Sequence, residues 1–122
     1  MHRIITAALC AVALALGACA SEPDRATVSA LTAAESSVQN AVSAGADRYS
    51  REALYSAREN LKKARAASAD GDDERALRFA AEAEADATYA AASARAAAVQ
   101  ASAEEIAQSL EALRQEAART AR

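Results

Sequence analysis

Alanine content constrains this chain more than any other feature: 40 of its 122 residues are alanine, against three glycines and one proline. Alanine is the strongest helix former, because ordering its side chain costs no rotamer entropy. Strands favour β-branched and aromatic residues, and aromatic residues make up only 3% of the chain. The composition therefore predicts an all-α protein.

The same composition limits the core, since a methyl side chain buries little apolar surface. After residue 19 the larger apolar side chains are few and are separated by alanines. They support a narrow seam between helices rather than a deep globular core. The formal net charge of −3 is small, and basic residues alternate with acidic ones, so we expect no nucleic-acid partner.

The first residues have the pattern of an export signal. Arg3 supplies a basic head, a continuous apolar run extends from residue 4 to residue 16, and small residues follow it. The apolar run is too short to cross a bilayer comfortably as a helix. This segment is therefore expected to direct export rather than to form part of the folded domain.

The end of that segment, Leu16-Gly17-Ala18-Cys19, resembles the lipobox of bacterial lipoproteins. In that family the cysteine thiol receives a diacylglyceryl group, the signal is cut before the cysteine, and the new amine is acylated. The resemblance implies a signal peptide over residues 1–18, cleavage between Ala18 and Cys19, and lipidation of Cys19. Two or three acyl chains would hold the mature protein stably at a membrane. The alternatives are an ordinary signal peptide with an incidental cysteine, or an uncleaved N-terminal anchor.

The lipoprotein resemblance also implies a destination. An aspartate directly after the lipidated cysteine commonly retains a lipoprotein in the inner membrane, whereas Ala20 and Ser21 follow Cys19 here. We therefore expect a lipid anchor in the outer membrane, facing the periplasm, with inner-membrane retention as the less favoured alternative. The chain ends in Arg122 rather than in lysine, so no covalent peptidoglycan link is expected.

The remainder of the chain divides into a tether and a helical domain. Residues 19–26 include Pro23 and lack an apolar pattern, which predicts a flexible tether. Gly45 is expected to end one helix, and Ser50 to cap the next. A turn follows at Gly71, after which Asp72 can cap a long final helix. In residues 27–122 the pattern predicts helices at about 27–44, 51–69 and 73–119.

Two arrangements of these helices remain. The favoured one is a long antiparallel helical hairpin, coiled-coil-like, with arms 27–69 and 73–119 around Gly71 and a break near Gly45–Ser50. It covers the heptad-spaced apolar residues at the end of the chain, which are Val99, Ile106, Leu110 and Leu113. The alternative is a three-helix bundle with an extended last helix, which leaves this stripe exposed and in need of a partner.

The middle of the chain resembles the bacterial lipoprotein family catalogued as domain of unknown function 4398. The residues that carry the resemblance lie between Ala53 and Ala94: Ala57-Arg58-Glu59-Asn60-Leu61, Ala64, Ala67, Gly71-Asp72, Ala76, Ala80, Ala83 and Ala87. Members are short alanine-rich periplasmic lipoproteins, or similar segments placed before an OmpA-like peptidoglycan-binding domain. The chain departs from the family at Asp73, where an aromatic residue is common, and at Arg51, where proline is common. Residues 71–83 also look like the middle of a tetratricopeptide repeat, without a second copy at the expected period.

Residues that could support catalysis are scarce. The only histidine, His2, lies in the expected signal peptide, so histidine-based catalysis and His/Cys metal sites are not expected in the mature protein. Several acidic residues fall on helix faces where solvation explains them: Glu82, Glu84, Asp86, Glu104 and Glu105. We expect no enzymatic activity and no cofactor other than the covalent diacylglycerol and N-acyl groups on Cys19.

These patterns favour a lipid-anchored, non-catalytic periplasmic protein of the cell envelope, acting as a structural spacer or a protein-docking module. The partner is expected to be another protein or a second copy of the chain. The alternative is a carrier or chaperone-like binder of a hydrophobic ligand, or a tetratricopeptide-like adaptor. Four aromatic residues near the turn either fill space that alanine cannot or form a docking patch: Tyr49, Tyr55, Phe79 and Tyr89.

Overall fold

The computed structural model describes residues 24–121, which form four helices and no strand. These are α2 (Arg25–Ser43), α3 (Ala46–Tyr49), α4 (Arg51–Ala69) and α5 (Asp73–Thr120). The all-α expectation is confirmed. The three longer helices begin and end within two residues of their expected ranges, and α2 starts inside the segment expected to be tether. The one-turn helix α3 is not predicted by the sequence pattern.

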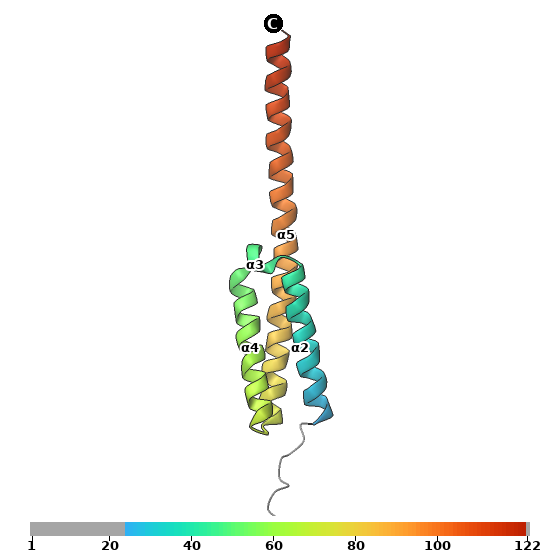
Figure 1. Cartoon of the computed structure of the whole chain (residues 1–122), viewed down its shortest axis with the longest axis vertical. Helices are drawn as coiled ribbons and strands as arrows, with labels where there is room; N and C mark the ends of the chain where they lie inside the picture. Colours follow the sequence, from blue (N-terminus) through green and yellow to red (C-terminus); the bar gives the residue numbers. More distant parts are fainter. Residues whose placement is uncertain (1–23, 122) are drawn as a thin grey trace, which may run out of the picture.

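Three helices form a bundle from which the last one projects (Figure 1). α4 runs antiparallel to α2 and α5, and α5 packs against both of them. The Thr27 hydroxyl, at the start of α2, donates a hydrogen bond to Asp73 at the start of α5 over 2.6 Å. Arg65 of α4 pairs with Glu35 of α2 at 2.6 Å. The long-hairpin arrangement is therefore wrong, and the alternative, a three-helix bundle with an extended last helix, is the observed one.

The direction of the apolar residues on α5 explains why the hairpin does not form. From Ala76 to Ala94, the alanines of α5 that face α2 and α4 are buried. Val99 and Ile106 belong to a different heptad series, which points more than about 100° away from those alanines around the helix axis. One straight helical arm packed along α5 cannot cover both series. The chain therefore covers the first series with two helices and leaves the second exposed.

Two glycines reverse the chain at the ends of α2 and α4. Gly45 and Gly71 have φ values of 82° and 76°, a left-handed conformation that glycine adopts without steric cost. At the second turn the Gly71 amide bonds the Ser68 carbonyl and the Asp72 amide bonds the Ala67 carbonyl, which is a Schellman motif. Both reversals place consecutive helices side by side, as the bundle requires.

The helix caps differ from one another. Asp72 caps α5 as expected, since its side chain accepts a hydrogen bond from the Arg75 amide at 3.0 Å. Ser50 holds the N-cap position of α4, but its side chain makes no capping hydrogen bond. Tyr49, just before it, packs against the core cluster instead. Apolar contact therefore helps to fix the start of α4.

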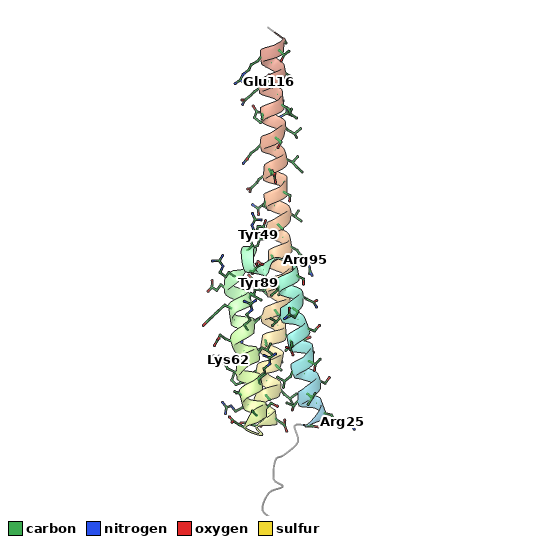
Figure 2. All side chains as sticks on the ribbon, in the orientation of Figure 1. Arg25, Tyr49, Lys62, Tyr89, Arg95 and Glu116 are labelled. Carbon is green, nitrogen blue, oxygen red and sulfur yellow. The ribbon has the colours of Figure 1, made fainter. Side chains whose placement is uncertain are left out.

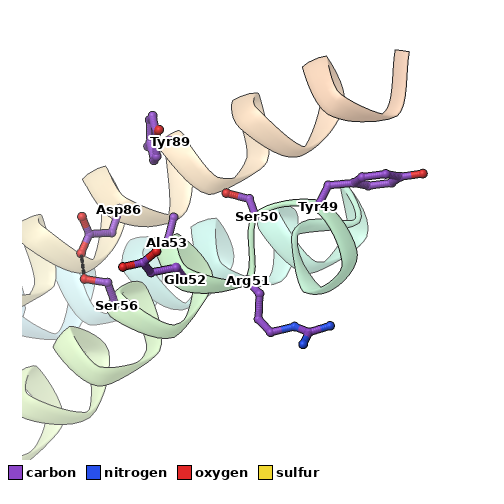
Figure 3. Close-up of a pocket in the computed structure, with 8 residues that line it drawn as sticks. All are labelled: Tyr49, Ser50, Arg51, Glu52, Ala53, Ser56, Asp86 and Tyr89. Atoms are coloured by element: carbon purple, nitrogen blue, oxygen red, sulfur yellow. Dashed lines mark hydrogen bonds between the residues drawn. The ribbon is translucent and has the colours of Figure 1, made fainter. Parts of the chain in front are cut away.

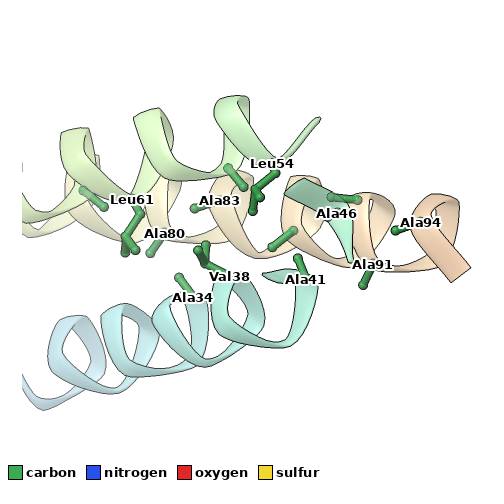
Figure 4. Close-up of a cluster of buried hydrophobic side chains, with 14 residues drawn as sticks. Ala34, Val38, Ala41, Ala46, Leu54, Leu61, Ala80, Ala83, Ala91 and Ala94 are labelled. Carbon is green, nitrogen blue, oxygen red and sulfur yellow. The ribbon is translucent and has the colours of Figure 1, made fainter. Parts of the chain in front are cut away.

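Alanine dominates the core of the bundle (Figure 4). The larger buried side chains are Val38 from α2 with Leu54 and Leu61 from α4, while every residue that α5 buries is alanine. Methyl side chains allow the helix backbones to approach closely, so dispersion contacts compensate for the small apolar area. The result is the narrow seam that the composition predicts.

Beyond residue 98 α5 has no neighbour among the described residues, and each of its residues from 99 to 121 is exposed. At 1.5 Å per residue, the 48 residues of α5 extend for about 72 Å. Side chains radiate from the extension in all directions (Figure 2). Its four large apolar residues, Val99, Ile106, Leu110 and Leu113, are 71, 62, 50 and 67% exposed.

Candidate functional site

The expected lipidation site, Cys19, and the cleavage position after Ala18 lie outside the described residues, as does the whole of the expected signal peptide. The described part of the chain begins just before α2, at the end of the bundle opposite to the free tip of α5 (Figure 1). Among residues 24–121, no helix combines the length and apolar character that a membrane span requires.

An exposed apolar face on α5 is the most extensive candidate site. Starting from Val99 and stepping by three and four residues in both directions gives ten positions, all uncharged and all exposed. We call this set the outer stripe: Ala85, Tyr89, Ala92, Ala96, Val99, Ala103, Ile106, Leu110, Leu113 and Ala117. The heptad spacing is that of a coiled-coil seam, whose residues pack against a second helix.

The outer stripe begins on the bundle and runs onto the extension. Its first members on the bundle, Ala85, Tyr89 and Ala92, are exposed but border the other helices: Tyr89 lines a hollow with residues of α3 and α4, and Ala92 lines one with Ser37 and Asn40 of α2. Two shallow surface hollows lie along the stripe. One is lined by residues around Tyr89 and the other by Ala98, Val99, Ser102, Ala103 and Ile106. The second hollow includes Val99, Ser102, Ala103 and Ile106, whose spacing is that of the four residues around one inserted side chain in a coiled coil.

The other face of the extension mixes polar residues with alanines. Steps of three and four residues from the buried Ala94 give Ala98, Ala101, Glu105, Gln108, Ala112, Gln115 and Arg119, and those past residue 98 are exposed. Charged neighbours on this side pair along the helix, as Arg119 does with Glu116 at 3.7 Å. Exposed pairs of this kind stabilise little. A longer α2 or α4 would therefore meet an alanine surface interrupted by Glu105, Gln108, Gln115 and Arg119.

A further hollow lies where α3 meets α4 and α5 (Figure 3). Asp86 is half-buried here, and one of its oxygens accepts hydrogen bonds from the Ser56 hydroxyl at 2.6 Å and the Asn60 amide at 3.0 Å. These bonds tie α4 to α5 through one oxygen of the Asp86 carboxylate.

The remaining expected residues are spread rather than gathered. Tyr49 and Phe79 are half-buried against the core, whereas Tyr55 and Tyr89 are 65 and 66% exposed. The four aromatics therefore do not form one patch, and only Tyr89 belongs to the outer stripe. The acidic residues Glu82, Glu84, Glu104 and Glu105 are all exposed. No group of three potential metal ligands occurs within the described part of the chain.

Comparison with family models matches residues 29–106 to the family described as Domain of unknown function (DUF4398). The chain belongs to this family. The match includes the bundle from Ser29 onward and the first part of the outer stripe, up to Ile106. It starts well before Ala53, where the sequence resemblance begins, so α2 is part of the family domain. Searches of curated proteins and of solved structures gave no significant match.

Proposed function

We propose that this protein is a lipid-anchored, non-catalytic component of the bacterial cell envelope that docks a helix of another polypeptide chain along the outer stripe of α5. The observation that carries the proposal is the exposure of the stripe's four large apolar residues on a helix that projects beyond its own bundle. An exposed apolar surface of this length marks an interaction site in a soluble domain.

The fold suits a docking role. The bundle holds the first half of α5 through Thr27, Asp86 and the alanine seam, so the helix leaves the bundle with a fixed direction. A rigid helix presents its apolar face with little loss of conformational freedom on binding, which favours affinity. The proposal also includes a spacer role, because the extension carries Val99, Ile106, Leu110 and Leu113 beyond the bundle.

The lipid anchor is supported by the lipobox-like segment ending at Cys19 and by the position of α2. Since α2 begins at Arg25, the tether leaves the end of the bundle that is farthest from the tip of α5 (Figure 2). Anchoring at Cys19 would then direct the extension away from the membrane surface. The choice of the outer membrane rests on Ala20 and Ser21, which follow Cys19 in place of an aspartate.

The anchor is tested by replacing Cys19. The Cys19→Ser variant is expected to take up no labelled palmitate and to leave the membrane fraction, because the thiol that carries the diacylglyceryl group is gone. Wild-type protein is expected to be labelled and to fractionate with the outer membrane. An unlabelled wild type, together with a variant that still fractionates with membranes, would refute the anchor.

The docking surface is tested separately, by a photo-crosslinking residue placed in the full chain in intact cells. At position 110, on the outer stripe, we expect crosslinks to protein. At position 108, on the other face of the extension two residues away, we expect none, since the two side chains point in different directions. Equal crosslinking at the two positions, or none at either, would refute docking through the stripe.

A further inference from the structure

We infer that the helix which occupies the outer stripe is α5 of a second copy of this chain, packed antiparallel so that Ala96 of each copy faces Ile106 of the other. This inference rests on the proposed docking role and names its partner. It does not depend on the anchor, because every contact that it uses lies on α5.

The alternation of small and large residues along the stripe supports an antiparallel pair. When the two helices are centred on residue 101, all ten stripe residues of one copy meet all ten of the other. Ala92 then faces Leu110 of the second copy, Ala96 faces Ile106, and Val99 faces Ala103. In most of the facing pairs, a large side chain of one copy meets an alanine of the other, and this is how interdigitated helix interfaces reach dense packing.

A parallel pair would pack the same residues poorly. Each stripe residue would meet its own copy, so pairs of alanines would gather at 92, 96 and 103, and pairs of large side chains would gather at 106, 110 and 113. The helix axes cannot satisfy both spacings at once, and cavities would remain at the alanine levels. Val99 and Ile106 would also take the position at which parallel two-stranded coiled coils prefer leucine.

Charges beside the stripe agree with the antiparallel register. The residues that flank the interface bring Arg114 of one copy toward Asp86 of the other, twice in the symmetric pair. Asp86 already accepts two hydrogen bonds through one carboxylate oxygen, and neither uses its second oxygen. No two like charges face each other across the flanks in this register. The partner's chain end would lie along the exposed face of α5 at Ala85, Tyr89 and Ala92, bordered by α4 on one side and by α2 on the other.

The area is sufficient for a stable pair. The stripe extends over residues 85–117, about 48 Å at 1.5 Å per residue, and each copy contributes four large apolar side chains that are at least half exposed. The hollow at Val99, Ser102, Ala103 and Ile106 is one of the recesses that would receive Val99 of the second copy. A helix of another protein would need the same alternation, which the second copy provides by symmetry.

Disulfide crosslinking of full-length chains tests the register. Two differently tagged chains are co-expressed, one with Ala96→Cys and the other with Ile106→Cys, and the unmodified chain with Cys10 and Cys19 sets the background. We expect a mixed-tag disulfide dimer from this pair and none from either variant alone, because equal positions lie about 15 Å apart along the antiparallel axes. Gln108→Cys, on the other face of the extension, is the matched negative control.

Four outcomes overturn the inference. Dimers of Ala96→Cys with itself would show a parallel pair, and a mixed dimer of Ala96→Cys with Leu113→Cys in its place would show a different register. Crosslinks from position 110 to a different protein would preserve the docking role but refute self-association.

Finally, Leu110→Glu is expected to weaken self-association of the chain by at least about tenfold, since it places a charge among apolar side chains of the interface, while Gln108→Glu leaves it unchanged. Equal dissociation constants for these two variants, measured by analytical ultracentrifugation, would refute the interface.

Discussion

Enlarging one buried alanine of α4 tests the close packing of the bundle. Ala64 is fully buried, whereas Ala66, two residues later on the same helix, is exposed. Leucine has nearly the same helix propensity as alanine, so Ala66→Leu controls for the helix itself. At position 64 the three added carbon atoms must enter the seam with α5, where the facing side chains are alanines and leave no room to withdraw.

Overpacking of a dense core costs about 1–3 kcal/mol, and about 1 kcal/mol lowers the melting temperature of a domain this size by roughly 4–8 °C. We therefore expect Ala64→Leu to melt at least about 5 °C below the wild type, and Ala66→Leu to melt within about 2 °C of it. Thermal unfolding followed by circular dichroism measures both. If the two variants melt together, or if Ala64→Leu stabilises the protein, the seam is not close-packed and the reasoning fails.

Three further predictions concern the links between helices and the extension. Thr27→Val should lower the free energy of unfolding by about 1–2 kcal/mol in urea titrations, because Asp73 loses the hydroxyl donor of a buried residue, and Thr27→Ser should retain most of that energy. Gly45→Ala and Gly71→Ala should each cost about 1–2 kcal/mol for the left-handed backbone. The two costs should be similar, because a Cβ added at Gly45 meets only the Tyr49 ring, at 3.6 Å, and one added at Gly71 meets nothing within 4 Å. Unequal losses of stability in the two variants would contradict this. In the Leu110→Glu variant, amides at 100–119 should exchange with solvent faster than those at 76–94, and uniform protection would show that the extension has another source of stability.

The sequence predicts the local features of this fold well. Gly71 and Asp72 act only on the residues beside them, so a left-handed glycine followed by a capping aspartate can be identified without knowing the tertiary structure. The end of α4 and the start of α5 follow from these signals. Helix α3 has four residues, which is too short for an apolar period to appear.

The packing of α2 is harder to predict, because either topology gives its apolar residues an alanine surface. The deciding signal is the phase of two heptad series on α5. Counting back from Val99 gives Ala92 and Ala85, not the buried Ala90 and Ala83. Alanine gives little hydropathy contrast, so the two series merge when only the spacing of apolar residues is considered. The four large aliphatic residues of the outer stripe contrast with their neighbours in hydropathy and could be predicted. The alanines that continue the stripe over the bundle show little contrast, so that part could not be predicted.

The unbroken course of α5 has a consequence for how this protein can vary in length. Because no kink or turn separates the bundle from the tip, each residue inserted into the extension moves everything beyond it outward by about 1.5 Å and around by about 100°. An insertion of seven residues would lengthen the molecule by about 10 Å and return the apolar face to its former direction. An insertion of four would turn that face by about 40–50° and misalign it with its partner. The reach of the molecule can therefore change with its apolar face kept in direction when the insertion is close to a whole number of turns, as it is for seven or eleven residues.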